Sequence, residues 1–394
     1  MKILVLAWEF PPRIVGGISR HVAELYPEFV KLGHEVHLLT VEFGHAPHYE
    51  VVDGIQVHRL PVGASHNFFH WVTNMNESMG RQGGKLLQEK PFGIIHAHDW
   101  LVADAAVALK NLFKVPLIAT IHATEYGRMS GLHNEIHHHI NSKEAFLAAE
   151  AWRVIVCTDY MRLEVGWALS CPSDKLDVIY NGICQEKKQP RREFDFWKFR
   201  RRFAADQEKI VYYVGRLTYE KGIDLLLSAA PSVIWQMGGR VKFVIIGGGN
   251  ADALKRQAWD LGIWHKCYFT GFMSDEELNQ FRRVANCAVF PSRYEPFGIV
   301  ALENFAARIP VVVSGAGGLP EVVFHSKTGI VTQAGNVDSL AWGILEVLKN
   351  PDYAEWLVGN AYRDLDERFS WTELAKQTEQ VYERVVQEGA EQDW

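Results

Sequence analysis

Hydrophobic residues follow two alternating patterns along this chain. Short runs rich in Val, Ile and Leu are typical of buried strands, and they are separated by longer segments whose apolar residues recur every three or four positions, as in amphipathic helices. This order of elements predicts an α/β fold of doubly wound, parallel sheets.

The two halves of the chain carry the same alternation. In the first half we expect strands at Lys2–Ala7, Glu35–Leu39, Gly93–His96, Pro116–Thr120, Val154–Cys157 and Asp177–Ile179 and helices at Ile18–Lys31 and Asp99–Leu112. In the second half we expect strands at Ile210–Val214, Val241–Ile246, Cys267–Phe269, Ala288–Phe290 and Val311–Ser314 and helices at Ile223–Ile234, Asp252–Leu261, Asp275–Val284 and Val337–Leu348.

A linker is expected between the halves, because Asn181-Gly182 is a turn signal and residues 185–202 carry no strand pattern. We therefore predict an N-terminal domain over residues 1–184 and a C-terminal domain over residues 200–370. The linker mixes basic and aromatic residues, a composition that an interfacial membrane helix would also have. We favour a solvated linker that runs into a short helix and docks its aromatic side chains.

Composition narrows the function classes. The 394 residues are 48% hydrophobic and 22% charged, as in soluble globular proteins, and the net charge of −6 gives no basic surface for nucleic acid. No apolar run is long enough for a membrane span or a signal peptide, so we predict a cytoplasmic protein. The five cysteines include no Cys-x-x-Cys, and neither a disulfide nor a zinc site is expected.

The most informative motif runs from Glu295 to Glu303, where two carboxylates flank a Pro-Phe-Gly turn at the start of a predicted helix. The amides of Gly298, Ile299 and Val300 are then unpaired donors at a helix N-terminus, which favours an anion. Carboxylates on both sides suit a ligand that is part sugar and part diphosphate. A purely structural Glu-Pro-x-Gly loop is the alternative.

A second motif places two cations at the end of the strand that finishes at Gly215. Arg216 and Lys221 can clamp a diphosphate, the guanidinium by its fork geometry and the ammonium as a point charge.

Taken with Glu9-Phe-Pro-Pro-Arg-Ile-Val-Gly-Gly17 and His122-Ala-Thr-Glu-Tyr-Gly-Arg128, these motifs resemble the retaining glycosyltransferases of family four over nearly the whole chain. The resemblance implies a GT-B fold, in which two Rossmann-like domains face a central cleft and a C-terminal helix (residues 371–394, beginning at Trp371) packs back on the first domain. It implies transfer of a hexose from a nucleoside-diphosphate sugar with retention of configuration.

The candidate site residues fall into three groups. The catalytic candidates are His122, which by resemblance touches the donor sugar, and Arg216, Lys221 and Glu295. The donor-binding candidates are Gly16, Gly17, Gly248, Phe272, Met273, Phe297, Gly298, Ile299, Val300 and Glu303, with Glu303 expected to hold both ribose hydroxyls. The acceptor-binding candidates are Arg13, Arg20, Glu125, Tyr126, Arg128 and His133.

Three other patterns suggest different chemistry and are set aside. Gly247-Gly248-Gly249 fails the dinucleotide fingerprint because Asp252 stands at its sixth position, so a dehydrogenase is disfavoured. The histidines around Leu132–Ile140 could hold a metal, but no cysteine or carboxylate pair completes a site. Asp364-Leu-Asp366 lies in a predicted helix and is expected to be a solvated face. Most tryptophans in predicted helices are expected to pack in cores or between domains: Trp100, Trp152, Trp167, Trp259 and Trp342.

No metal or other cofactor is expected to be required, because two cations can neutralise the leaving diphosphate. UDP-glucose is the expected donor, with ADP-glucose left open. The arginines on the acceptor side favour a sugar phosphate such as fructose 6-phosphate, as in sucrose-phosphate synthases, and an α-glucan, as in glycogen synthases, is the close alternative. A nucleotide-sugar epimerase and a non-catalytic binder are further alternatives that the paired cation and carboxylate motifs disfavour.

Overall fold

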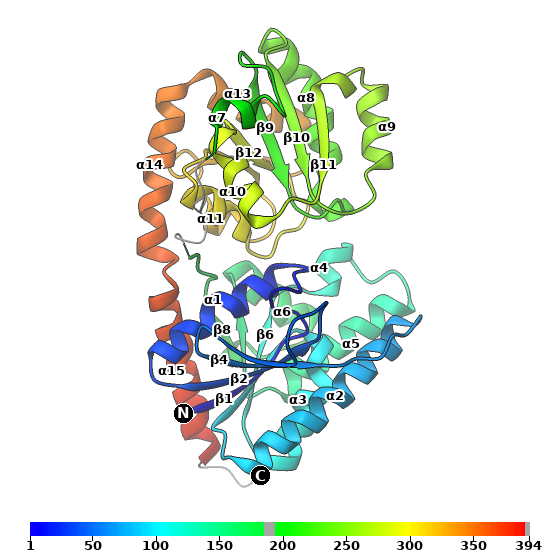
Figure 1. The fold of residues 1–394 in the computed structure, drawn as a ribbon, viewed down its shortest axis with the longest axis vertical. Coiled ribbons are helices and arrows are strands. Elements are labelled where there is room, and N and C mark those ends of the chain that lie inside the picture. The colour runs from blue at the N-terminus through cyan, green and yellow to red at the C-terminus, as the bar shows by residue number, and fades with distance from the viewer. Residues whose placement is uncertain (185–193, 391–394) are drawn as a thin grey trace. The chain divides into compact units, whose positions relative to one another are not determined.

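The structure, a computed structural model, describes residues 1–184 and 194–390 in two compact units (Figure 1). The first unit is Met1–Gly182 with Trp371–Trp394, and the second is Ile183–Ser370. Each is a parallel sheet covered by helices, so the predicted pair of doubly wound α/β domains is confirmed.

The described strands of the first unit form an eight-stranded sheet in the order β3-β4-β2-β1-β5-β6-β7-β8. All neighbours are parallel except β3 and β4, which form an antiparallel hairpin. The strands are β1 Lys2–Leu6, β2 Glu35–Val41, β3 Tyr49–Val52, β4 Ile55–Leu60, β5 Ile94–His98, β6 Leu117–Ile121, β7 Arg153–Val156 and β8 Leu176–Val178. Five of them are buried along almost their entire length, which explains their unbroken apolar runs.

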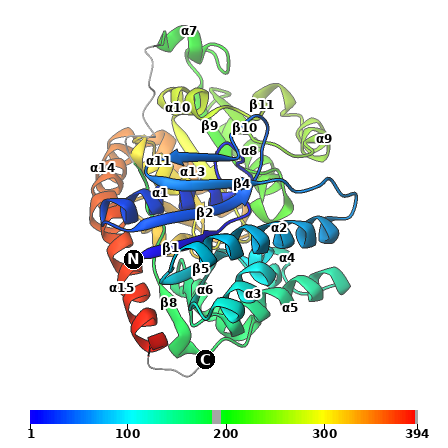
Figure 2. The ribbon, with the colours of Figure 1, turned by 60° about the horizontal axis from the view of Figure 1, so that its bottom comes forward.

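Helices cover both faces of this sheet. Its helices are α1 Gly17–Lys31, α2 Phe68–Glu89, η1 Trp100–Val102, α3 Ala103–Phe113, α4 Glu125–Met129, α5 Glu135–Glu150, α6 Asp159–Ala168, η2 Ser173–Lys175 and α15 Trp371–Ala390. Figures 1 and 2 show α15 beside α1 on one face and α2, α3 and α5 on the other. Trp371 donates its indole N–H to Glu24 at 3.0 Å, and its ring joins the core beneath α1, which fixes the C-terminal helix on this unit.

The second unit has a wholly parallel sheet in the order β11-β10-β9-β12-β13-β14. The strands are β9 Lys209–Val214, β10 Val241–Ile246, β11 Cys267–Gly271, β12 Cys287–Phe290, β13 Val311–Ser314 and β14 Ile330–Thr332. The helices are α7 Phe196–Arg200, η4 Tyr219–Lys221, α8 Ile223–Gln236, α9 Asp252–Asp260, η5 Trp264–Lys266, α10 Asp275–Val284, α11 Ile299–Ala306, α12 Leu319–Val322, α13 Val337–Lys349 and α14 Pro351–Arg368.

The β3–β4 hairpin, α2 and β14 have no counterpart among the elements predicted from the sequence. Asp53 and Gly54 both have positive φ, at 49° and 85°, and Asp-Gly flanked by short strands is a strong hairpin signal. For α2 the signal was the N-cap Asn67, whose side-chain oxygen accepts from the amides of Phe69 and His70.

Two expectations about helices need correction. Trp100 is buried in η1, whereas Trp152 lies after the end of α5 and is not in a helix. Trp167, Trp259 and Trp342 are about half exposed, so core packing is wrong for those three, and packing between domains stays a prediction. On α14, Asp366 is exposed as expected. Asp364 is buried and paired with Arg368 at 2.8 Å, so it belongs to no solvated face.

The linker prediction is tested only in part, because residues 185–193 lie outside the described residues. Beyond them a short helix, α7, forms as expected, and Phe199 docks against Phe203 while Phe196 and Trp197 stay exposed. All five cysteines carry free thiols. Every helix in the described part of the chain is too short or too polar to cross a membrane.

Candidate active site

The Glu295 loop of the second unit is held from two sides. Lys221 donates to the Glu295 carboxylate at 2.8 Å, and both side chains are mostly buried. The carbonyl of Glu295 accepts from the Gly318 amide at 2.8 Å. A Cβ at Gly317, whose φ is +61°, would lie 2.1 Å from that carbonyl oxygen, so the approach requires glycine. Gly317 and Gly318 are not among the predicted site residues, although several glycines directly after an apolar strand were a signal for them.

The N-terminus of α11 follows this loop. Gly298 is its N-cap, with φ +100°, and no side chain caps the helix. Phe297 is buried and packs edge-on against Phe369. The first-turn amides of Ile299 and Val300 therefore follow the Glu295 loop directly, and a helix N-terminus of this kind favours an anion.

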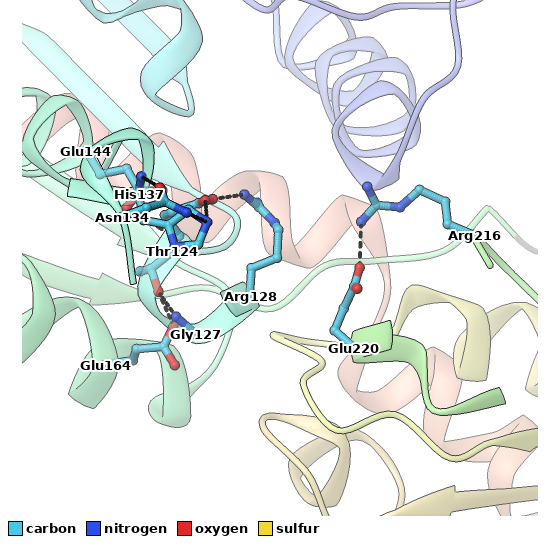
Figure 3. Close-up of polar contacts among 10 residues, drawn as sticks. Thr124, Gly127, Arg128, Asn134, His137, Glu144, Glu164, Arg216 and Glu220 are labelled. Carbon is cyan, nitrogen blue, oxygen red and sulfur yellow. Dashed lines mark hydrogen bonds and ion pairs between the residues drawn. The ribbon is translucent and has the colours of Figure 1, made fainter. Parts of the chain in front are cut away.

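Arg216 lies just after β9 and is half exposed. Its guanidinium is 3.5 Å from the carboxylate of Glu220 (Figure 3). That carboxylate also accepts from the Thr218 hydroxyl at 2.7 Å. Because the guanidinium is half exposed and the contact is long, the pair is weak and Arg216 can exchange Glu220 for a ligand at little cost.

Glycines bring the ends of β9 and β10 into contact. A Cβ on Gly247 would lie only 1.8 Å from the Gly215 carbonyl oxygen. The Gly248 carbonyl accepts from the Leu217 amide at 3.0 Å, so Gly248 positions the loop that carries Arg216. The glycine run thus forms a tight βα turn.

Glu303, the expected ribose ligand, lies on α11. It is buried, and its carboxylate pairs with the buried guanidinium of Arg282 at 2.5 Å. Arg282 also donates to Asn279 at 2.9 Å. Of the two residues expected near the base, Phe272 is exposed and Met273 is buried.

In the first unit, the glycine pair at the start of α1 already has an anionic partner. Glu9 accepts from the amides of Val15 and Gly16 at 2.6 and 2.9 Å. Burial raises the pKa of Glu9, and these amides partly offset that effect. A diphosphate could use this terminus only after Glu9 rotates away.

Arg13 lies among three aromatic rings. Its guanidinium carbon is 5.4, 5.9 and 5.5 Å from the ring centres of Trp8, Phe43 and Trp71. Burial lowers the pKa of Arg13, and the Glu9 charge opposes that shift.

His122 directly follows β6 at the carboxyl edge of the sheet. Its backbone amide donates to the Asp99 carboxylate at 2.7 Å, and its Nε2 lies 3.1 Å from Nδ1 of His98. Burial lowers the pKa of His122 to about 3, so the ring is neutral at pH 7. A neutral imidazole at the sheet edge where ligands bind can donate a hydrogen bond to a sugar hydroxyl or accept one from it.

The segment after His122 is held by buried acids. Thr124 caps α4 by accepting from the Gly127 amide at 3.0 Å, and its hydroxyl donates to Glu164 (Figure 3). The Glu125 amide donates to Glu144, and the Glu125 carboxylate pairs with Arg128 at 3.0 Å.

The remaining acceptor-side candidates lie near this segment. The Tyr126 ring packs edge-on against Trp167, with centres 4.4 Å apart. His133 is exposed and contacts the Met129 carbonyl at 3.0 Å, and its ring lies 5.9 Å from that of His137, its neighbour one turn along. Arg20 is half-buried in the first turns of α1.

Comparisons with known proteins agree with this architecture. A model described as Glycosyltransferase Family 4 matches residues 15–187, and one described as Glycosyl transferases group 1 matches residues 195–364. An uncharacterized glycosyltransferase of Methanocaldococcus jannaschii is 40% identical, covering 98% of this chain and 99% of the relative. A glycogen synthase of Mycobacterium tuberculosis is 33% identical, covering 97% and 94%. Sucrose-phosphate synthase from Thermosynechococcus elongatus has the same fold, with a TM-score of 0.82 at 23% identity and 98% coverage of both chains.

The fold, the loops at the strand ends of the second unit and the relatives all agree. Because those relatives are matched over nearly their whole length, the chain belongs to the GT-B glycosyltransferases and is a hexosyltransferase.

Proposed function

We propose that this hexosyltransferase moves a glucosyl unit from a nucleoside-diphosphate glucose, with UDP-glucose the expected donor, and retains configuration. The observation that carries the proposal is the pair of Lys221 with Glu295, at 2.8 Å. Glu295 lies in the loop before α11, and the N-terminus of that helix has no side-chain cap. The Lys221 ammonium and the helix amides suit the diphosphate, while the Glu295 carboxylate suits sugar hydroxyls.

In this proposal the chemistry depends on stabilising the departing diphosphate. Arg216 and Lys221 would share its charge with the amides of Ile299 and Val300, and the leaving oxygen would gain negative charge as the glycosidic bond breaks. Glu295 and neutral His122 would hold the transferred sugar. Loss of one such charge-stabilising donor costs about 3–4 kcal/mol of transition-state stabilisation, or on the order of 10²–10³ in rate.

For the acceptor we propose a neutral α-glucan. Two arginines that suggested a phosphate already have partners, because Arg128 pairs with Glu125 and Arg13 is enclosed by aromatic rings near Glu9. Trp167, half exposed beside Tyr126, offers an aromatic face of the kind that sugar rings pack against. The glycogen synthase relative, matched over 97% of this chain, supports the same acceptor class.

A sugar phosphate such as fructose 6-phosphate is the second candidate. It is favoured by the position of Arg20 in the first turns of α1 and by the fold shared with sucrose-phosphate synthase.

One experiment separates these alternatives. Release of the nucleoside diphosphate, UDP from UDP-glucose or ADP from ADP-glucose, is measured with maltotetraose, fructose 6-phosphate, fructose or buffer. We expect maltotetraose to stimulate release. Stimulation by fructose 6-phosphate alone would instead establish the second candidate, and it should then fall in Arg20→Gln. Conversion of the donor to another nucleotide sugar, without transfer, would identify an epimerase and overturn both.

A further inference from the structure

Three histidines from distant parts of the sequence meet at the carboxyl edge of the first sheet. His98 ends β5, His122 follows the neighbouring strand β6, and His21 lies in the first turns of α1. One ring nitrogen of each lies within 4.8 Å of the others. Within residues 1–184 and 194–390, this is the one group of three His, Cys, Asp or Glu side chains with such spacing.

His21 presents an unused lone pair in the interior of the unit. Its Nδ1 lies 2.6 Å from the side-chain oxygen of Asn181, which can only accept, so Nδ1 carries the proton and Nε2 does not. His21 is only 7% exposed, and its Nε2 is buried without a hydrogen-bond partner. A buried acceptor of this kind is costly unless a ligand uses it.

The other two rings already have almost the spacing of metal ligands. His98 Nδ1 and His122 Nε2 are hydrogen-bonded at 3.1 Å, so a metal ion would replace the proton that lies between them, while the Nε2 of His98 lies 2.8 Å from the Tyr26 hydroxyl. Zinc–nitrogen bonds of 2.0–2.1 Å at tetrahedral angles place two ligand nitrogens about 3.4 Å apart. Only His21 needs to move closer. Asn181 and Tyr26 are the kind of partner that orients a metal-bound imidazole through its other nitrogen.

We propose that His21, His98 and His122 form a binding site for Zn²⁺ or a similar borderline transition-metal ion. Three imidazole ligands suit zinc, copper, nickel or cobalt and not magnesium or calcium, and they leave a fourth position for water. The Asp99 carboxylate, bonded to the His122 amide, supplies nearby negative charge.

A metal ion bound to these histidines should inhibit the transfer reaction. A metal-bound His122 cannot contact the donor sugar, so bound Zn²⁺ should block transfer and EDTA should restore it. This consequence rests on the proposed function, whereas metal binding itself does not.

Binding is tested on the full chain after EDTA treatment and dialysis. Zn²⁺ is titrated by calorimetry, and Co²⁺ is followed by the visible absorption of tetrahedral cobalt. We expect one equivalent in the wild type. Because loss of a residue that merely orients a ligand costs 10–100-fold in affinity, His21→Gln and His98→Gln should each weaken binding by about 100-fold or more.

Two histidine variants outside the group are the matched controls. His37→Gln changes a buried histidine that bonds Glu35, and His137→Gln changes a partly buried histidine whose Nδ1 accepts from the His133 amide at 3.2 Å. Both should bind Zn²⁺ as the wild type does. Loss of binding in His137→Gln with retention in His21→Gln would overturn the site, as would a wild type that binds no Zn²⁺ at 100-fold molar excess.

The wild type alone provides a test that does not depend on the variants folding. X-ray absorption of the Zn²⁺-loaded chain should show imidazole scattering from three ligands at about 2.0–2.1 Å. A spectrum without imidazole would overturn the proposal. If zinc binds at these histidines but UDP release from UDP-glucose is unchanged, the metal site is established and the role of His122 in holding the donor is refuted.

Discussion

Replacing Glu303 with alanine separates two roles of this carboxylate. In the structure it pairs with Arg282 at 2.5 Å, and both side chains are almost completely buried. Glu303→Ala leaves a buried guanidinium without its counter-charge, which typically costs about 3–5 kcal/mol. For a unit of this size, each kcal/mol shifts the midpoint of thermal unfolding by about 2–4 °C, so we expect a fall of about 6–20 °C.

The ribose role is measured on a variant that keeps the interior neutral. Replacing the pair together, as Arg282→Met with Glu303→Leu, leaves no unpaired charge and should return stability close to that of the wild type. UDP titration by calorimetry on this double variant then reports the loss of ribose contacts alone. We expect UDP affinity to fall by at least about tenfold, which corresponds to one hydrogen-bonded charged group.

The matched control is Glu277→Ala, which breaks the exposed Arg202–Glu277 pair in the same unit. It should cost about 1 kcal/mol or less. If Glu303→Ala melts within 2 °C of this control, the buried-pair argument fails. If the double variant binds UDP as tightly as the wild type, Glu303 is structural and the ribose is held elsewhere.

Three other predictions follow from the site. Arg216→Ala and Lys221→Ala should each lower turnover at saturating donor by on the order of 10²–10³, with circular dichroism unchanged, and either variant that keeps a third of the activity would refute the diphosphate clamp. Transfer should survive excess EDTA; loss that Mg²⁺ or Mn²⁺ restores would show that a metal is required. Burial raises the pKa of Glu144 from 4.5 to about 8, so the folded chain holds an extra proton between these values, and its stability should fall as pH rises from about 4.5 to 8. Glu144→Gln should flatten that fall and melt above the wild type at pH 8.5 but not at pH 5; parallel melting curves would contradict it.

The strands were predictable where they are buried on both faces. Val241–Ile246 and Val311–Ser314 match the structure residue for residue, because a central parallel strand needs an unbroken apolar run. Tyr49–Val52 was missed because it is an edge strand, largely exposed, with no such run.

The site was predictable only where residues lie close in sequence. Arg216 and Lys221 could be read as one loop, and Glu295 to Gly298 as another. The Arg282–Glu303 pair joins α10 to α11, and no local pattern indicates it. His98 and His122 are 24 positions apart, yet both end neighbouring parallel strands, so a search for polar residues at adjacent strand ends could have found them.

The two glycine-led helix starts differ in a way that bears on where the donor diphosphate binds. At the start of α1, Glu9 already accepts from the amides of Val15 and Gly16, so an incoming diphosphate would meet a carboxylate in its place. At the start of α11, no side chain caps the helix, and the Lys221 ammonium pairs with Glu295 in the loop that precedes it. An anion is repelled by the first terminus and attracted by the second. The principal diphosphate contacts should therefore come from the second unit, and Gly16 and Gly17 can contribute only if Glu9 gives up its two hydrogen bonds.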